Sequence, residues 1–498
     1  MTLKSSAAAF LAGAILAAGP AMAGKDLFVI DLASEPTSLD PHVQWNPDSY
    51  YVYRNVFDNL VTRNDAGTVV PEIATSWQKL SDSEIEFTLR SDAVFHDGKP
   101  VTPDDVAFSV KRITNPAFKS PQLGQFNKIT DAVVTGPNKV KLVTDGPYPA
   151  LMAQLVKLSV VPRHAVTAMG DTQFNQTPLG SGPYKFTGWQ RGVKVTLEAN
   201  AGYWGAKGPF PQVEFRAVPD AATRVANLRA GRSDLIVTIN PDHAAELKGD
   251  PRVKVLSVVT ERVAYLRLNT LAGPTANLKV RQAIAHAIDK AGIVDSLLGG
   301  YDKPANIMAT EAHFGYVPGF KGHAFDPARA RQLVAEAGDA AKGELVLITA
   351  PVFDQRIVQA LQQMIADVGL NVQISLSDMQ SYLRRSQGPA EQAGSLAFGR
   401  WSCACQDLDG VVLPLFQTGS IWSKFSDPAM DKALIEARST LDDAKRLAAY
   451  RRVHEIVEAQ VPAVPLYEAA VLYAARREVG WQPTANESLF LNRMSWKD

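Results

Sequence analysis

Cysteine is the rarest residue in this chain, because only Cys403 and Cys405 occur among 498 residues. A disulfide-rich scaffold is therefore excluded. Beyond the first 23 residues, no apolar run approaches the ~20 residues that span a bilayer, so we expect no direct membrane insertion. The formal net charge is zero and Lys and Arg are scattered. Nothing in this pattern indicates a nucleic-acid or anionic-membrane partner.

Catalytic sequence motifs are also missing. The chain contains no HExxH, no GxxxxGK[ST] and no GxSxG motif. No histidine lies within four residues of another. We therefore expect a protein that is not an enzyme and that has neither a cofactor nor a local metal site.

The first 23 residues have the form of a cleavable signal peptide. Lys4 precedes a mostly apolar run from Ala7 to Ala18, and Ala21-Met22-Ala23 is a small-x-small cleavage site. Cysteine is absent near this site, so a lipid anchor has no attachment point. We expect export to a Gram-negative periplasm and a mature chain that begins at Gly24. At about 475 residues, that chain exceeds the ~250–300 residues that one core supports, which predicts more than one domain.

The segment from Asn55 to Arg112 carries the clearest local pattern. Residues 84–90 alternate polar and apolar side chains as a half-buried strand does. Asp97-Gly98 follows as a turn, and Thr102 with Pro103 predicts a capped helix start.

Further segments predict strands and capped helices along the rest of the chain. Asp220 and Gly231 bound one predicted helix, Asp326-Pro327 and Gly338 bound another, and Pro462 ends a third, on which Leu447, Tyr450, Val453, His454 and Val457 have helical spacing. The segments that carry these strand and helix patterns are 181–205, 220–235, 265–270, 280–290, 326–338, 370–376 and 427–468.

Taken in order, these segments resemble the peptide/opine/nickel family of periplasmic solute-binding proteins, family 5, over almost the whole mature chain. The resemblance implies an α/β, two-lobed periplasmic-binding-protein fold of type II, whose N-terminal lobe is enlarged by an extra subdomain. It implies hinge strands at Leu266–Thr270 and Leu466–Leu472. The expected division is a signal peptide at 1–23, lobe I at 24–55, 177–268 and 471–498, the extra subdomain at 56–176, and lobe II at 269–470.

The resemblance places ligand contacts in the segment Gly399–Gly410. Peptide binders of the family have a Trp followed three residues later by an Asp that pairs with the α-ammonium of the peptide. Here Trp401 is followed by Ala404, and the later acids are Asp407 and Asp409. A buried ammonium without a carboxylate partner is costly, so the departure favours a modified peptide, an opine or a sugar conjugate.

Each candidate residue has a plainer alternative. Trp401 can pack in a core, Asp407 and Asp409 can serve in turns or helix caps, and Arg400 can be a solvated surface group. Arg356 aligns with a family region that helps to hold a ligand carboxylate. The loop of His42 to Asn46 is otherwise an exposed connection. The candidate ligand-binding residues are Gln44, Trp45, Asn46, Arg356, Arg400, Trp401, Asp407 and Asp409.

The two cysteines are separated by one residue. At this spacing the Cα atoms approach the ~7 Å limit for bridging, so a disulfide demands a bent backbone. We expect buried free thiols ahead of a disulfide. A metal site is the least favoured alternative, because two ligands fall short of a tetrahedral set.

These features predict the periplasmic substrate-binding component of an ABC importer. It would capture a peptide or peptide-like solute in an interlobe cleft and deliver it to the permease subunits as a monomer. Binding of an opine, a sugar conjugate or a metal chelate is the alternative within the class. A chaperone-like holder of unfolded segments is the alternative from another class.

Overall fold

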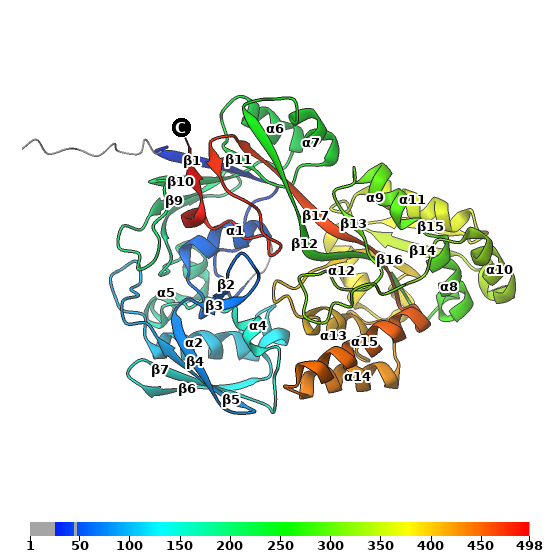
Figure 1. The fold of residues 1–498 in the computed structure, drawn as a ribbon, viewed down its shortest axis with the longest axis horizontal. Helices are drawn as coiled ribbons and strands as arrows, with labels where there is room; N and C mark the ends of the chain where they lie inside the picture. Colours follow the sequence, from blue (N-terminus) through cyan, green and yellow to red (C-terminus); the bar gives the residue numbers. More distant parts are fainter. Residues whose placement is uncertain (1–24, 44–46, 498) are drawn as a thin grey trace, which may run out of the picture.

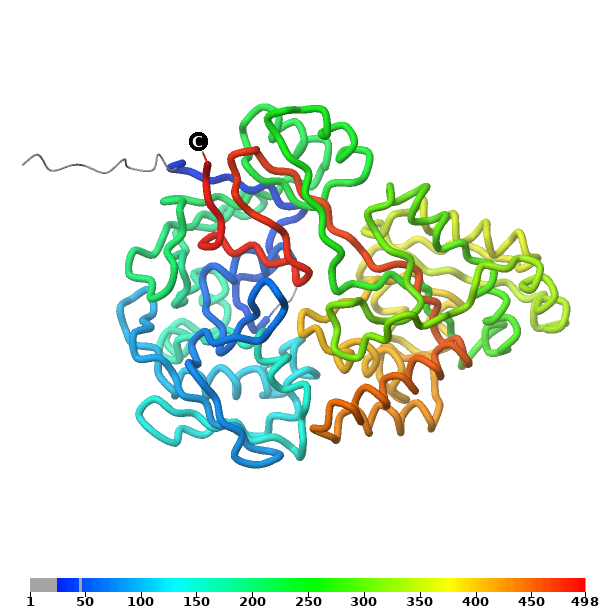
Figure 2. The backbone as a smooth tube through the Cα atoms, viewed as in Figure 1, coloured from blue at the N-terminus to red at the C-terminus, as the bar shows by residue number. Residues whose placement is uncertain are grey.

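Two long antiparallel strands run through the middle of the molecule. The structure is a computed structural model that describes residues 25–43 and 47–497. Strand β12 (Val253–Leu268) pairs along its length with β17 (Ala463–Arg476). Both strands far exceed the usual five or six residues, and in Figures 1 and 2 they pass side by side between two bodies. The main sheet of the described residues has the order β15-β14-β16-β12-β17-β11-β1-β10-β9-β8, with β13 paired to β17.

The register shows where the chain passes from one body to the other. Val253 to Val259 of β12 pair with β17, the register is irregular between Val259 and Val263, and from Val263 onward β12 also pairs with β16. We call the described residues before 260 and after 469 the first lobe, and residues 263–468 the second lobe. Leu266 and Leu268, which we expected at the crossing, are fully buried in the core of the second lobe. The crossing on β12 therefore lies a few residues earlier than the sequence predicted.

The first lobe contains both described ends of the chain (Figure 2). β1 pairs in parallel with β10 and β11, and the rings of Phe28 and Phe210 stack with centroids 4.1 Å apart in the core. Its elements are β1 (Leu27–Leu32), α1 (Pro47–Val56), α5 (Arg163–Gln176), β8 (Tyr184–Gln190), β9 (Lys194–Ala199), β10 (Gln212–Ala217), α6 (Ala221–Arg229), β11 (Leu235–Ile236), α7 (Pro241–Leu247), β18 (Val479–Gly480), the 3-10 helix η5 (Leu491–Arg493) and β19 (Ser495–Trp496).

A smaller antiparallel sheet with its own core extends the first lobe. Phe87, Val106 and Leu142 are fully buried between this sheet and α2. Its order is β4-β5-β7-β6, and β2 pairs with β3 beside it. The elements here are β2 (Val61–Arg63), β3 (Val69–Pro71), β4 (Ala74–Ser81), β5 (Glu84–Leu89), α2 (Pro103–Thr114), η1 (Pro116–Phe118), α3 (Leu123–Phe126), β6 (Ile129–Gly136), β7 (Lys139–Thr144) and α4 (Leu151–Leu155).

The second lobe packs helices on both sides of its part of the sheet (Figure 1). One core includes Leu266 and Leu347, and another includes Tyr450 and Val453. The elements here are η2 (Pro274–Ala276), α8 (Leu278–Ala287), α9 (Lys290–Leu297), β13 (Lys303–Pro304), α10 (Pro327–Ala337), η3 (Gly338–Lys342), β14 (Leu345–Thr349), α11 (Gln355–Ala366), β15 (Val372–Leu376), α12 (Met379–Gln387), η4 (Ala390–Gln392), β16 (Leu396–Trp401), α13 (Asp409–Phe416), α14 (Pro428–Ser439) and α15 (Asp443–Gln460).

Most local expectations are confirmed. The predicted strand at 84–90 is β5, and α2 begins at Pro103 with the Asp105 carboxylate accepting from the Thr102 amide at 3.0 Å. The helix expected at 280–290 is instead broken. Ile288 is extended, and Asp289 caps α9 by accepting from the Gly292 amide at 2.9 Å. Leu447, which has helical spacing with the buried residues of α15, is 40% exposed.

Replacing Gly180 by alanine should destabilise the fold. The turn at Gly180 and Gly182 packs on the end of α1, and a Cβ on Gly180 would lie 2.7 Å from the carbonyl carbon of Val56. Overpacking against backbone costs about 1–3 kcal/mol, so Gly180→Ala should lower the free energy of unfolding by that amount in a urea titration. Gly124→Ala, where a Cβ meets nothing within 4 Å, is the matched control. Equal stability of the two variants would contradict this packing.

Candidate functional site

The loop between β16 and α13 is closed by a disulfide. Gln406 has a left-handed backbone with φ 52°, and its amide donates to the Cys403 carbonyl at 2.8 Å. This tight turn brings the Cα atoms of Cys403 and Cys405 to 5.0 Å, and their sulfurs are bonded. Our expectation of free thiols is therefore wrong, because the backbone bends as a bridge at this spacing requires. Gly410 packs on the disulfide, where a Cβ would lie 2.8 Å from Cys405 Sγ.

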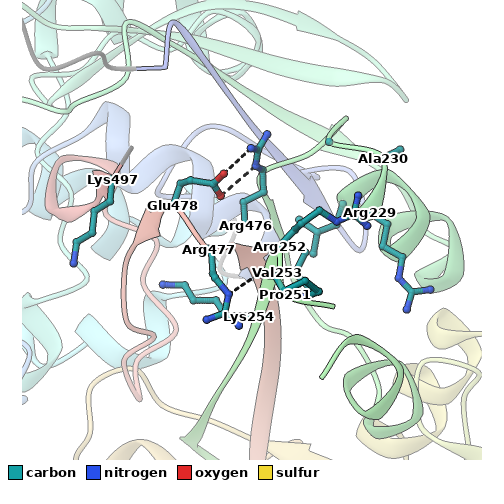
Figure 3. Close-up of a pocket in the computed structure, with 12 residues that line it drawn as sticks. Arg229, Ala230, Pro251, Arg252, Val253, Lys254, Arg476, Arg477, Glu478 and Lys497 are labelled. Carbon is teal, nitrogen blue, oxygen red and sulfur yellow. Dashed lines mark hydrogen bonds and ion pairs between the residues drawn. The ribbon is translucent and has the colours of Figure 1, made fainter. Parts of the chain in front are cut away.

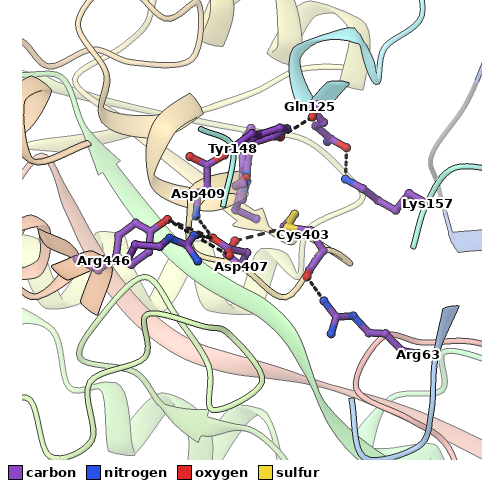
Figure 4. Close-up of a disulfide and its surroundings, with 12 residues drawn as sticks. Arg63, Gln125, Tyr148, Lys157, Cys403, Asp407, Asp409 and Arg446 are labelled. Carbon is purple, nitrogen blue, oxygen red and sulfur yellow. Dashed lines mark hydrogen bonds and ion pairs between the residues drawn. A yellow bond between two sulfur atoms is a disulfide. The ribbon is translucent and has the colours of Figure 1, made fainter. Parts of the chain in front are cut away.

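Asp407 lies buried behind this loop and is held by the second lobe. Its carboxylate accepts from Arg446 at 2.8 Å, from the Tyr450 hydroxyl at 3.1 Å and from the Asp409 amide at 3.0 Å (Figure 4). Asp407 and Arg446 each have 4% of the side chain exposed. With these donors in place, the Asp407 carboxylate anchors the loop to α15.

Asp409 is the first residue of α13 and is also buried. Its carboxylate lies 2.8 Å from Arg438 Nε, with 5% of the Asp409 side chain exposed. Burial raises the pKa of Asp409 to about 6, while the charge of Arg438 acts in the opposite direction. Both acids of the segment are thus engaged with arginines of their own lobe.

Trp401 and Arg400 end strand β16. Trp401 Nε1 donates to the Gly410 carbonyl at 2.9 Å, and the ring meets Trp422 edge-on with centroids 5.3 Å apart. Trp401 is half-buried. Arg400 is exposed, and within residues 25–43 and 47–497 it forms neither an ion pair nor a hydrogen bond.

The remaining sequence candidates lie elsewhere. Arg356 is half exposed, pairs with Asp354 at 2.7 Å and lies 3.6 Å from Asp242 of α7, across the two lobes. Gln44, Trp45 and Asn46 lie outside the described residues. The neighbouring His42 is fully buried, with Nε2 2.8 Å from the Ser159 carbonyl oxygen.

The two lobes touch at the disulfide loop. Arg63 at the end of β2 donates to the Cys405 carbonyl (Figure 4). A Cβ on Gly67 would lie 3.3 Å from the Gln406 side chain. Nearby, the Arg438 guanidinium lies 5.8 Å from the ring of Tyr148, which belongs to the first lobe. We call this set the interlobe contact. Sequence reasoning missed Arg63, because no local pattern distinguishes it from other strand-end arginines.

Buried polar atoms near Arg63 lack hydrogen-bond partners in the part of the chain that the structure describes. They are Arg63 Nε, His313 Nε2 and Glu261 Oε2. Burial, followed by the charge of Glu487, raises the pKa of Glu261. Burial lowers the pKa of His313 to about 4, so this ring is neutral near pH 7. Arg262, next to Glu261, lies 2.7 Å from Glu487 of the C-terminal segment. Sequence reasoning also missed Glu261 and Arg262, and a Glu-Arg pair between valine residues is the signal that could have found them.

Metal ligands do not gather anywhere in the described ranges. Across residues 25–43 and 47–497, no group of three or more His, Cys, Asp or Glu side chains could hold an ion. Within the same ranges, no helix is long and apolar enough to cross a membrane.

Comparison with known proteins identifies the class. The model of the bacterial extracellular solute-binding proteins, family 5 (middle region), matches residues 68–421. The chain belongs to this family, and it is a solute-binding protein of an ABC transport system rather than an enzyme.

Individual relatives share about a quarter of their residues with this chain. Heme-binding protein A of Haemophilus influenzae is 28% identical over 88% of this chain and 86% of its own length. The dipeptide-binding protein of Escherichia coli K12 is 26% identical over 89% of each. The structure of AgaA from A. tumefaciens R10 in complex with agropinic acid superposes with a TM-score of 0.81, at 26% identity, over 95% of this chain and 99% of that one. The mixed α/β periplasmic-binding-protein fold is thereby established.

Removing the charge of Asp407 should unfold the second lobe more readily. Breaking a buried ion pair by removing one partner costs about 3–5 kcal/mol, so Asp407→Asn should lower the free energy of unfolding by that amount. Asp443→Asn, at an exposed position on α15, should change it by less than about 0.5 kcal/mol. Denaturant titration measures both. A similar, small effect of the two substitutions would rule out the anchoring role of Asp407.

The cysteines should resist alkylation until the protein is reduced. A bridge that closes so short a loop stabilises by about 1–2 kcal/mol on the chain-entropy estimate, so the Cys403→Ser/Cys405→Ser variant should lose that much free energy of unfolding. Mass spectrometry after alkylation in denaturant, with and without reductant, checks the pairing, because denaturant exposes buried free thiols. Labelling of both thiols in the denatured but unreduced protein would contradict it.

Proposed function

We propose that this protein is the periplasmic solute receptor of an ABC importer and that it holds its solute between the lobes, beside the interlobe contact. The observation that carries the proposal is the set of buried polar atoms without partners at Arg63, His313 and Glu261. Leaving such an atom unpaired costs about 1–3 kcal/mol. Arg63 belongs to the first lobe, His313 to the second, and Glu261 to the strand β12 that crosses between them. A polar solute placed there would contact both lobes and the crossing strand.

Arg400 is our candidate for the group that recognises charge on the solute. It is the exposed cation at the end of β16 and has no ion-pair partner in the described ranges. In contrast, Asp407 and Asp409 are occupied by Arg446 and Arg438. The chain thus offers a free guanidinium and no free carboxylate in the Gly399–Gly410 segment. Since guanidinium groups bind carboxylates by paired hydrogen bonds, we propose a peptide-like solute that presents a carboxylate and needs no free amine.

An opine is the second candidate. The similarity to AgaA, whose structure contains agropinic acid, favours it. Gln44, Trp45 and Asn46 remain proposed contacts, and Trp401 is a proposed contact from the second lobe. Arg356 is proposed only as a peripheral contact, because Asp354 and Asp242 already lie within reach of it.

Closure around the solute is the expected mechanism. The two chain crossings pair side by side, and we propose that they allow rotation near residues 260–262, where the register of β12 is irregular and each lobe keeps its own core. A solute that contacts both lobes binds the closed form more tightly and therefore shifts the population toward it. The closed receptor would then be the species that docks on the permease.

Arg400→Ala should weaken solute binding by about tenfold to a hundredfold, since a hydrogen bond to a charged group contributes about 1.5–3 kcal/mol. Calorimetry with free-amine peptides, N-acetylated peptides and agropinic acid should identify the solute class, and small-angle scattering should show a smaller radius of gyration on binding.

The control variant is Arg451→Ala, which removes an exposed cation on α15 and should bind the solute as the wild type does. Tight binding that requires a free amine and survives Arg400→Ala would refute the assignment of the solute class. An unchanged radius of gyration at saturation would refute binding between the lobes.

A further inference from the structure

A second concentration of charge lies on the first lobe, at the ends of β12 and β17 that point away from the second lobe. A hollow of about 760 Å³ opens there between the end of α6, the start of β12, the end of β17 and the C-terminal segment (Figure 3). Among the described residues that line this hollow, Glu478 is the one acidic residue, so the lining is strongly positive while the whole chain has no net charge. The cationic lining residues are Arg229, Arg252, Lys254, Arg476, Arg477 and Lys497.

Half of these cations are neutralised by neighbouring acids. Arg229 pairs with Glu246, Arg252 with Asp250 at 2.7 Å, and Arg476 with Glu478 at 2.7 Å. These pairs engage Glu478, the acid of the lining, and leave three cations of the lining without an ion pair to any described residue.

Lys254, Arg477 and Lys497 form the uncompensated set. Within the described residues none of them makes an ion pair. Lys254 donates to the Val479 carbonyl and Arg477 Nε donates to the Pro251 carbonyl, so neutral oxygens hold the two side chains at the hollow. Burial, followed by the charges of Lys497 and Arg477, lowers the pKa of Lys254. Lys254 therefore lies close enough to Lys497 and to Arg477 to be repelled by both charges.

The hollow continues into a second one. Lys254 and Lys497 also line a neighbouring hollow of about 420 Å³, together with Arg493 and Asp65, which pair with each other at 3.2 Å. The two hollows share these lysines, so one elongated ligand could contact both. A volume of several hundred Å³ is in the range of small-molecule sites.

We propose that these hollows form an anion site for a ligand that carries phosphate groups, separate from the solute site between the lobes. Two ammonium groups and the free end of one guanidinium, arranged around a concave surface, match the charge and the several acceptor oxygens of a phosphate. Binding of an anion would offset the repulsion that Lys497 and Arg477 exert on Lys254. The phosphate can belong to a soluble molecule or to the headgroup of an anionic phospholipid. Binding of pyrophosphate and binding of lipid vesicles distinguish these two sources.

The test uses the full mature protein at about 0.15 M ionic strength, where charges more than about 8 Å apart are screened. Inorganic pyrophosphate is titrated calorimetrically, and vesicles of phosphatidylglycerol are tested by flotation against vesicles of phosphatidylcholine. The test variant is Lys254→Gln/Arg477→Gln/Lys497→Gln. The matched control, Lys321→Gln/Lys432→Gln/Arg451→Gln, removes the same charge from exposed positions of the second lobe.

The wild type and the control should bind, and the test variant should lose at least about tenfold in affinity, which corresponds to one lost charged contact. Binding of pyrophosphate supports a soluble ligand, and binding of phosphatidylglycerol vesicles alone supports a headgroup. Lys497→Gln by itself should weaken binding severalfold and serves if the triple variant does not fold. Absence of binding to both probes, or an equal loss in the control, would overturn the site. Neither result bears on the solute site, because Arg400 is unchanged in all these variants.

Discussion

The pairing of β12 with β17 is the constraint on which the rest of the structure depends. Because these strands extend the sheet of one lobe into that of the other, the lobes share a hydrogen-bonded connection while each keeps its own core. The irregular register between Val259 and Val263 marks the point where β12 gains β16 as a second partner. Glu261 and Arg262 lie at this point, so polar side chains occupy the one stretch of β12 that belongs to neither core. The position of the candidate site follows from this interruption.

The disulfide loop lies on the surface of the second lobe that contacts the first lobe, and several interactions fix its conformation. The turn at Gln406, the disulfide and Gly410 fix the backbone, and the buried pair of Asp407 with Arg446 ties it to α15. The Cys405 carbonyl is thereby directed at Arg63 of the first lobe. Because the carboxylates of Asp407 and Asp409 hold this loop in place, they are not free to bind a ligand. Recognition then falls to groups that the fold leaves unpaired.

The distribution of charge carries more information than its sum. Within the described residues, cations without an ion pair include Arg400 at the end of β16 and the set around Lys254 on the first lobe, as well as exposed residues such as Lys321 and Lys432. Other arginines have acidic partners at short distance, as Arg112 has in Asp40 at 2.6 Å. Composition alone does not show which cations are paired, because pairing depends on residues that meet only after folding.

The sequence by itself determined the local elements and, through their order, the family. Thr102-Pro103, Asp220, Asp326-Pro327 and the alternation at 84–90 act over a few residues, so their caps and strands could be predicted. The tertiary structure decided the rest. The partners of Asp407 and Asp409 are Arg446 and Arg438, more than 25 residues away in sequence, and the bridge between Cys403 and Cys405 required a turn that residue spacing does not specify. Ion pairs, unpaired polar atoms and strand crossings depend on distances across the fold, and no local pattern contains those distances.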